Sequence, residues 1–157
     1  MVWNFMESQG ITTESCYPYV SGTGIEPACQ TKCKDNSDFP GRHKCASKSV
    51  HPTTATNIKN EIYNNGPAEL AFTVYQDFMN YESGVYWHTT GSQLGGHAVT
   101  LVGYGTENGV EYWLCANSWS PRWGDSGFFK IKQGDSGSNG QIYTCPFAAP
   151  SSTQESF

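Results

Sequence analysis

Two residues of this chain, His97 and Asn117, have side chains that can cooperate in catalysis. The histidine stands in GGHAVTLVGYG and the asparagine in YWLCANSW. An asparagine carbonyl that accepts the N–H of one imidazole nitrogen fixes the tautomer and directs the other nitrogen at a nucleophile. Asparagine suits a cysteine nucleophile, because a thiolate–imidazolium pair needs no further negative charge to stabilise the cation. The pair therefore indicates acid–base chemistry beside a cysteine, whereas His97 taken alone is more often a structural histidine.

The spacing of the two residues makes a contact between them plausible without fixing it. Residues 97–105 and 110–118 read as two strands joined by a turn at GTENGV. A hairpin loop centred on Glu107 places the histidine opposite the asparagine. A four-residue loop over 106–109 would shift this pairing by one residue, and a tight Asn-Gly turn would shift it by three. The register of the hairpin therefore decides how the two side chains meet.

The remaining elements place these strands in an antiparallel sheet that we expect to curl into a barrel. Residues 68–75 and 127–132 read as further strands, because apolar residues alternate in the first and cluster in the second. Two helices are expected, over residues 2–10 and within 56–67. Thr56 or Asn57 is expected to cap the second helix, and Gly66 with Pro67 to end it. The segment between the helices is rich in turn-forming residues and cysteines.

The composition excludes several classes of protein. The chain has 157 residues and a net charge of −5, which argues against binding to nucleic acid. No apolar run is long enough for a membrane helix, and we expect neither a bound metal nor another cofactor. The six cysteines predict disulfides and an oxidising compartment, but they allow fifteen pairings. Since the start lacks a secretion signal, we expect that Met1 is not the biological start. Residues 151–157 read as a frayed tail.

Several blocks of the chain resemble the papain-like cysteine peptidases. They are GGHAVTLVGYG, YWLCANSW, the WG at 123–124 and GFFKI, in that order and spacing. Residues 64–88, NNGPAELAFTVYQDFMNYESGVYWH, are most similar to the cathepsin B branch. The resemblance implies an α+β fold, mainly the antiparallel β-barrel (right) domain with a remnant of the helical (left) domain. Residues 1–150 would then be the carboxyl-terminal part of one peptidase domain.

The resemblance also implies a role for each matching residue. His97 would be the general base and acid, and Asn117 would orient it. Trp119 would shield their hydrogen bond from water, whereas Trp123 reads as core packing. Gly95 and Gly96 would let the substrate backbone approach. Tyr143 falls near the position that shapes the pocket for the second residue before the cut.

The nucleophile that this chemistry needs is not expected within the sequence. The family's reactive cysteine lies in a C-G-[SA]-C-[WY] motif, well upstream of the histidine, and none of the six cysteines stands in such a motif. Cys115 reads as a core residue of a strand. We therefore expect the nucleophile on an amino-terminal part outside this chain, and the chain alone to be inactive. The stretch between Cys16 and Cys29 is short and lacks histidine, unlike the histidine-bearing loop that makes cathepsin B trim dipeptides, so we expect an endopeptidase.

The resemblance further implies a disulfide between Cys16 and Cys33, and a partner for Cys29 in the missing part. It gives no partner for Cys45 or Cys145. Peptide or protein substrates, cystatin-like inhibitors and a lysosomal, vacuolar or secreted location follow from the same resemblance.

Two rival interpretations remain open. A papain-like protein without activity could serve as a binding or structural module, although its expected signature is a substituted histidine or asparagine, and both are intact here. Alternatively, three cysteines and a histidine could bind zinc, since C-x3-C-x9-H-x-C is formed by Cys29, Cys33, His43 and Cys45. That spacing is not a usual zinc knuckle, and disulfides explain the same cysteines.

Overall fold

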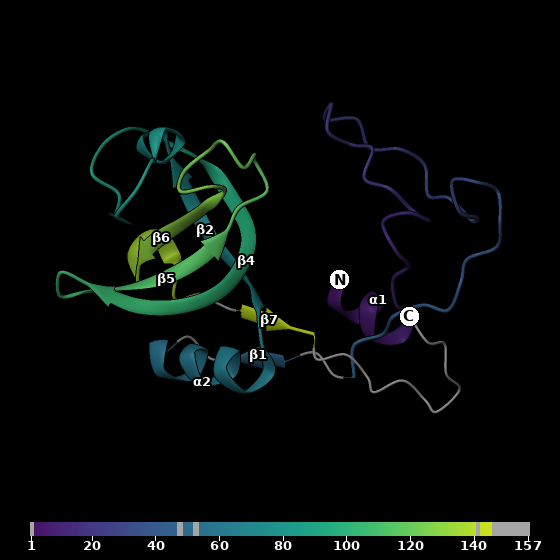
Figure 1. Cartoon of the computed structure of the whole chain (residues 1–157), viewed down its shortest axis with the longest axis horizontal. Coiled ribbons are helices and arrows are strands. Elements are labelled where there is room, and N and C mark those ends of the chain that lie inside the picture. Colours follow the sequence, from purple (N-terminus) through teal and green to yellow (C-terminus); the bar gives the residue numbers. More distant parts are fainter. Residues whose placement is uncertain (1, 47–48, 52–53, 141, 146–157) are drawn as a thin grey trace. The chain divides into compact units, whose positions relative to one another are not determined.

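The computed structural model describes residues 2–46, 49–51, 54–140 and 142–145. The chain divides into two compact units, residues 1–48 with 146–157 and residues 49–145 (Figure 1). The tail at 151–157 lies outside the described residues. A single peptidase domain over 1–150 therefore stays a prediction. No helix in the described part of the chain is long and apolar enough to cross a bilayer.

The first unit buries few apolar side chains in its described part. Its helix α1 (Val2–Ser8) is followed by Gly10, which has a φ of +76° and donates its N–H to the carbonyl of Phe5 at 3.0 Å. Beyond the helix, Ile11 and His43 form an isolated antiparallel bridge. Among residues 3–46, the only buried hydrophobic side chains are three cysteines: Cys16, Cys33 and Cys45. Disulfides therefore take the place of an apolar core in the described part of this unit.

The second unit is built on a seven-stranded sheet with the order β1-β7-β2-β4-β5-β6-β3. The strands are β1 (Ser49–His51), β2 (Ala68–Tyr75), β3 (Val85–Tyr86), β4 (Gln93–Glu107), β5 (Val110–Ala116), β6 (Phe128–Lys132) and β7 (Ile142–Thr144). The long strand β4 curves between its ladder neighbours β2 and β5 (Figure 1). The expected strands are thus confirmed, and three short strands are added to them.

One pairing departs from the expected antiparallel sheet. Strand β3 pairs with β6 in parallel, through Val85 with Lys130 and Tyr86 with Ile131, whereas the other pairings are antiparallel. A two-residue strand carries too short a pattern to be recognised, and the chain reaches it through a loop rather than a hairpin turn. The mixed sheet still gives the α+β class that the resemblance implies.

The N-cap of helix α2 (Ala55–Asn65) lies two residues before Thr56 and three before Asn57, the two expected caps. Thr54 is the N-cap, and its side-chain oxygen accepts the N–H of Asn57 at 3.3 Å. Neither Thr56 nor Asn57 caps the helix, because Thr54 already has the extended backbone that the cap position requires. The carboxyl end agrees with expectation, since Gly66 adopts a φ of +87° and donates its N–H to the carbonyl of Ile62. A short 3₁₀ helix, η2 (Asp135–Gly137), follows β6.

Strands β4 and β5 are joined by a tight two-residue Asn-Gly turn, which is one of the three alternatives that the sequence allows. The register from a loop centred on Glu107 is therefore wrong. Glu107 pairs with Val110 across Asn108 and Gly109, whose φ angles are +50° and +80°. Asparagine and glycine reach positive φ at low cost, and such a turn matches the twist of the strands. A bulge at Val102 then shifts the register by one residue, so Thr100 pairs with Ala116.

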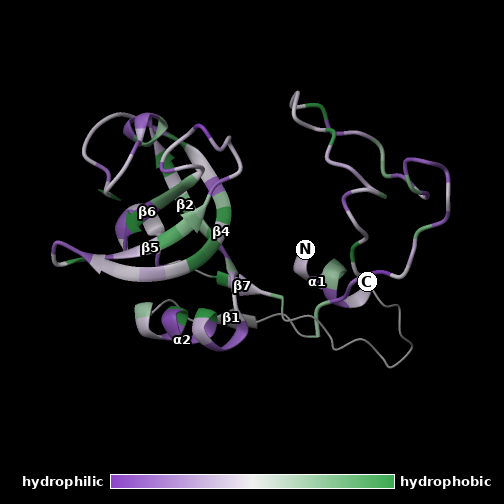
Figure 2. Cartoon of the chain, viewed as in Figure 1, coloured by the Kyte–Doolittle hydropathy of each residue, from purple (hydrophilic) through white to green (hydrophobic). Residues whose placement is uncertain are grey.

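The core of the second unit is an aromatic cluster within the sheet. Phe78, in the 3₁₀ helix η1 (Gln76–Asn80), is fully buried. Its ring lies within about 6 Å of the rings of Phe72, Tyr81, Tyr86, Trp119, Trp123 and Phe129. Figure 2 shows hydrophobic residues along β2 and β5, while α2 carries both hydrophobic and hydrophilic residues. The rings of Phe72 and Trp119 in this cluster also contact the ring of His97.

Candidate active site

The side chains of His97 and Asn117 meet although the ladder does not pair them. His97 lies on β4 opposite Phe72 of β2, and β5 ends at Ala116. After Ala116 the chain leaves the ladder, and the N–H of Asn117 bonds to the carbonyl of Gly127 at 2.9 Å. This turn brings Asn117 Oδ1 to 2.8 Å from His97 Nε2. The contact therefore depends on the strand end and not on the register.

The hydrogen bonds around Asn117 identify which imidazole nitrogen carries the proton. The backbone N–H of Ser118 also donates to Asn117 Oδ1, at 2.9 Å. An amide oxygen can only accept hydrogen bonds, so the hydrogen between it and His97 belongs to Nε2. The opposite nitrogen, Nδ1, then keeps its lone pair and can accept a proton. This is the tautomer that a histidine base requires.

Aromatic rings hold the imidazole on two sides. The ring of Trp119 stacks on that of His97 with centroids 5.0 Å apart and planes at 25°. The ring of Phe72 lies edge-on at 5.8 Å. Phe78 contacts both flanking rings, so the four rings form a closed circuit. Packing thus restricts the orientation of the imidazole. The shielding of its bond to Asn117 by Trp119 stays a prediction.

Trp123 packs into the core, as the sequence favours. Its ring contacts Phe78 and Phe129, and its indole N–H donates to the carbonyl of Met79 at 3.2 Å. It also contacts Trp119, at 4.9 Å between centroids and 74° between planes. Trp123 therefore supports the ring that stacks on His97 and does not itself reach the imidazole.

The glycine pair before the histidine leaves open space on β4. Gly95 has a φ of +152° and pairs with Val74. A Cβ atom added at Gly95 or Gly96 would meet no atom within 4 Å. The absence of side chains there leaves the backbone of the pair accessible. An extended peptide could therefore approach this stretch of β4 closely.

Tyr143 and His97 pair with different positions of strand β2. Tyr143 lies on β7 and pairs with Glu69 of β2, three positions along that strand from Phe72. Its register therefore gives no support to a role beside His97. The substrate contact expected of Tyr143 stays a prediction.

Cys115 is unsuited to act as a nucleophile. The side chain is fully buried between its ladder neighbours Leu101 and Phe129. Burial raises the pKa of the Cys115 thiol far above its usual range. A reactive cysteine needs the thiolate form and an exposed position. Cys115 is thus a core residue, as the sequence indicates.

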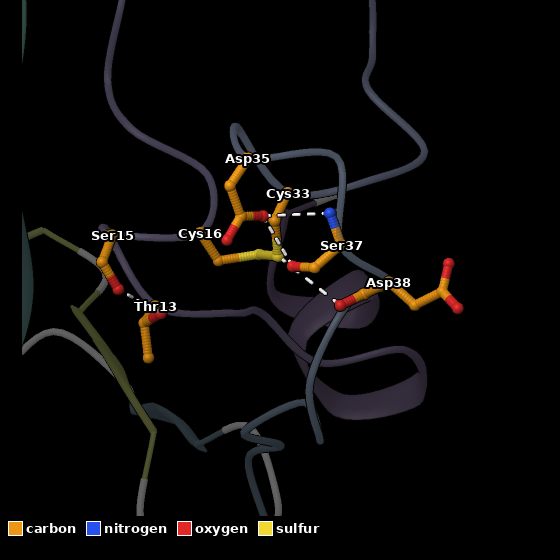
Figure 3. The surroundings of a disulfide bond; sticks show 7 residues. All are labelled: Thr13, Ser15, Cys16, Cys33, Asp35, Ser37 and Asp38. Carbon is orange, nitrogen blue, oxygen red and sulfur yellow. Dashed lines mark hydrogen bonds between the residues drawn. A yellow bond between two sulfur atoms is a disulfide. The ribbon is translucent and has the colours of Figure 1, made fainter.

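Three of the four cysteines of the first unit are in disulfides. Cys16 and Cys33 are joined, with Cα atoms 4.4 Å apart, in the pairing that the resemblance implies (Figure 3). Next to the bridge, the Asp35 carboxylate accepts the N–H and the hydroxyl of Ser37, at 3.0 and 2.6 Å. Cys45 is also disulfide-bonded.

These disulfides decide against the zinc alternative. Cys33 and Cys45 are both oxidised, so the C-x3-C-x9-H-x-C set loses two of its four ligands. Cys29 remains free and exposed.

Sequence reasoning missed a second cluster close to the site, around Asp77. Its carboxylate binds the segment between β3 and β4, and His88 of that segment stacks on Tyr75 with ring centroids 3.7 Å apart. The sequence signal is an acidic residue two positions after a strand, which is too common to be informative.

Comparison with known proteins gives this geometry its context. The family model described as "Papain family cysteine protease" matches residues 1–149. The chain therefore belongs to the papain family of cysteine proteases. Within it, the chain is similar to cathepsin B-like proteins. It is 50% identical over 132 residues to "Cathepsin B-like CP3" of Giardia intestinalis, covering 83% of this chain and 44% of that protein. It is 44% identical to "Cathepsin B" of Dictyostelium discoideum, covering 86% of this chain and 48% of the relative.

A solved structure supports the same assignment. Procathepsin B S9 from Trypanosoma congolense superposes with a TM-score of 0.84 at 31% identity, over 94% of this chain and 52% of that one. The chain thus spans less than half the length of the curated relatives described above.

Proposed function

We propose that this chain is the histidine- and asparagine-bearing part of a cysteine endopeptidase, with the nucleophilic cysteine on a segment outside this sequence. The observation that carries the proposal is the 2.8 Å contact between His97 and Asn117, stacked under Trp119, in a member of a cysteine protease family. The burial of Cys115 is consistent with a nucleophile from elsewhere.

The geometry supports a two-step hydrolysis. His97 Nδ1 accepts the proton of the cysteine thiol, and the thiolate attacks the peptide carbonyl carbon. The imidazolium then gives that proton to the leaving amine, and a thioester remains. Water next attacks the thioester while His97 takes one proton, which it returns to the cysteine sulfur as the acid leaves. Throughout, the carbonyl of Asn117 holds Nε2–H and stabilises the imidazolium.

Gly95 and Gly96 are the proposed contact for the substrate backbone. Because their positions on β4 carry no side chain and have open space, an extended peptide can lie along this stretch. Tyr143 is retained as the proposed wall of the pocket for the second residue before the cut.

An amino-terminal segment of the same protein is the proposed partner of the first unit. A hollow of about 350 Å³ in this unit is lined by apolar side chains, among them Phe5, Ile11, Tyr17 and Phe39. Cys29 also lines the hollow and carries a free, exposed thiol. An apolar hollow with a thiol at its wall suits a covering segment that carries a cysteine. We assign that role to the nucleophile-bearing part.

Two further parts of the proposal follow the family. Cystatin-like inhibitors are the proposed protein ligands of the cleft. A lysosomal, vacuolar or secreted location is proposed because disulfides persist in oxidising compartments, and Cys16 and Cys33 form one.

The first test is the intact mass of the protein from its native source, with and without reductant. A larger mass that falls to 17.3 kDa on reduction indicates a two-chain enzyme bridged by a disulfide. A larger mass under both conditions indicates one longer polypeptide. A mass of 17.3 kDa under both conditions, without peptide hydrolysis, would overturn the proposal in favour of a non-catalytic papain-like protein.

The second test separates endopeptidase from exopeptidase action in the native protein. We expect cleavage of an internally quenched peptide, and weak release of a carboxyl-terminal dipeptide. The His97→Ala variant should lose at least about 10³-fold in kcat, because the members of such a site act as a unit. Strong dipeptide release would contradict the endopeptidase assignment while leaving the peptidase class intact.

A further inference from the structure

The segment that leads into the candidate site has no regular structure of its own. Residues 87–92, here called the strap, connect β3 to β4. The strap ends where β4 begins at Gln93, shortly before Gly95, Gly96 and His97. Its path therefore sets how the chain enters the strand that carries these residues.

Two carboxylates hold the strap. Asp135 Oδ2 accepts the backbone N–H of His88 at 2.9 Å. Asp77 makes more contacts and also binds the strand before the strap. Asp77 Oδ2 accepts the backbone N–H groups of Thr89 and Thr90, at 2.8 and 3.1 Å. Its Oδ1 accepts the hydroxyl of Tyr86 at 2.8 Å, and Nδ1 of His88 lies 3.2 Å from both oxygens. Burial alone would raise the pKa of Asp77, but these hydrogen bonds outweigh burial and hold it well below its usual range.

The far end of the strap is fixed by the neighbouring residue. Gln76 donates its N–H to the carbonyl of Ser92, and the N–H of Ser92 donates back to Gln76 Oε1, both at 3.1 Å. Gly91 lies so close that an added Cβ would come within 2.7 Å of the Cβ of Gln76. The strap is therefore held at both ends by Gln76 and Asp77, the first two residues after β2.

Directly after the strap, the β2–β4 ladder contains a bulge. Tyr75 pairs with Gln93, but Val74 pairs with Gly95, so Leu94 is an extra residue on β4. Bulges redirect the strand and are frequent beside active sites. Here the bulge sets the direction in which the glycine pair and then His97 continue along β4. A strap released from Asp77 would keep its bonds to Gln76 and Asp135 but would restrain this bulge less firmly.

We propose that Asp77 is a positioning residue for the peptidase: by holding the strap it fixes the bulge at Leu94 and the backbone of Gly95 and Gly96 that receives the substrate. Asp77 does not contact the substrate or the reacting atoms. The inference rests on the function proposed above. Since His97 is also held by Phe72, Trp119 and Asn117, the effect of Asp77 falls on substrate binding more than on proton transfer.

The test uses the intact native peptidase and its Asp77→Asn variant. Asparagine keeps the size of the side chain but removes its charge. Its NH₂ group can also face a backbone N–H group, and two donors cannot form a hydrogen bond with each other. We expect KM to rise about tenfold with kcat within about threefold, as for the loss of one charge-assisted hydrogen bond. Asp38→Asn is the matched control, because that carboxylate is exposed and lies in the first unit. An unchanged KM would overturn the inference. A tenfold loss in kcat without a rise in KM would overturn it as well.

A second readout does not depend on activity. In the Asp77→Asn variant we expect faster amide hydrogen exchange at Thr89, at Thr90 and at the glycine pair, with α2 unchanged. Faster exchange confined to the strap would overturn the coupling to the glycine pair. If the wild-type protein cleaves no peptide, the proposed function fails, and the exchange at Gly95 and Gly96 alone decides this inference.

A milder variant covers the case in which Asp77→Asn does not fold. Tyr86→Phe removes one donor to Asp77 Oδ1 and leaves the backbone bonds to Oδ2 in place. We expect the same pattern at smaller size, with KM raised about twofold and kcat unchanged. A fall in kcat by the same factor as the rise in KM would contradict a positioning role. So would an unchanged KM together with unchanged hydrogen exchange.

Discussion

Replacing Asn117 by alanine in the intact peptidase tests the central contact of the site. The variant removes the oxygen that lies 2.8 Å from His97 Nε2. During catalysis that bond is made to an imidazolium, and hydrogen bonds to charged groups contribute about 1.5–3 kcal/mol. At about 1.4 kcal/mol for each factor of ten, kcat/KM should fall about 10-fold to 150-fold.

The surrounding rings set an upper limit to this loss. Trp119 and Phe72 still contact the imidazole in the variant, at 5.0 and 5.8 Å, so part of its orientation survives. Asn117→Ala should therefore retain more activity than His97→Ala, which removes the base itself.

The assay is the hydrolysis of an internally quenched peptide, followed across pH 4 to 8 together with the thermal unfolding midpoint. Asn60→Ala is the matched control, since Asn60 is exposed on α2 and the substitution keeps the backbone carbonyl that accepts the side-chain N–H of Asn64. A value of kcat/KM within twofold of wild type would refute the orienting role of Asn117. A loss as large as that of His97→Ala would refute the argument from the rings.

Four further outcomes follow from the same contacts. Phe78→Ala should lower the unfolding free energy by about 3–5 kcal/mol in urea titrations, whereas Phe128→Ala, at a 42% exposed side chain, should cost less than about 1 kcal/mol; equal costs would contradict the cluster. Thr54→Ala should cost about 1 kcal/mol by removing the cap of α2, and an unchanged midpoint would contradict it. Cys115 should resist iodoacetamide until the protein unfolds, because burial raises its pKa; rapid labelling of native protein would show otherwise. Burial raises the pKa of Asp77, but its hydrogen bonds lower the pKa by more, so its stabilising contribution is complete above about pH 4 and is lost as pH falls from there toward the folded-state pKa; Asp77→Asn should remove this acid-dependent loss of stability below about pH 4.

The sequence predicts those parts of the fold that repeat over several residues. The alternation in residues 68–75 places Leu70, Phe72 and Val74 on one face, and all three are buried. Such a pattern survives small errors because each apolar position supports the others. The positions of His97 and Asn117 near one another follow from the same strands and their short connection.

The register and the strap could not be predicted, for different reasons. The register depends on two local features, the Asn108 turn and the bulge at Val102. A bulge leaves no periodic signal, and each one shifts every later pair. The strap depends on the Asp77 carboxylate, whose partners lie 9 to 13 residues away in the chain. Contacts of that kind come from tertiary folding rather than from local pattern.

The base-bearing half of the site is assembled within the second unit alone. The groups described around His97 and Asn117 all lie between residues 72 and 127, and Phe78 ties their rings to the core. The orientation of the imidazole is therefore coupled to the stability of the sheet. On the proposed function, a cysteine supplied from another segment would need only to dock beside His97, because contacts within the second unit already orient the ring. The proposed nucleophile would then depend on this unit for its base.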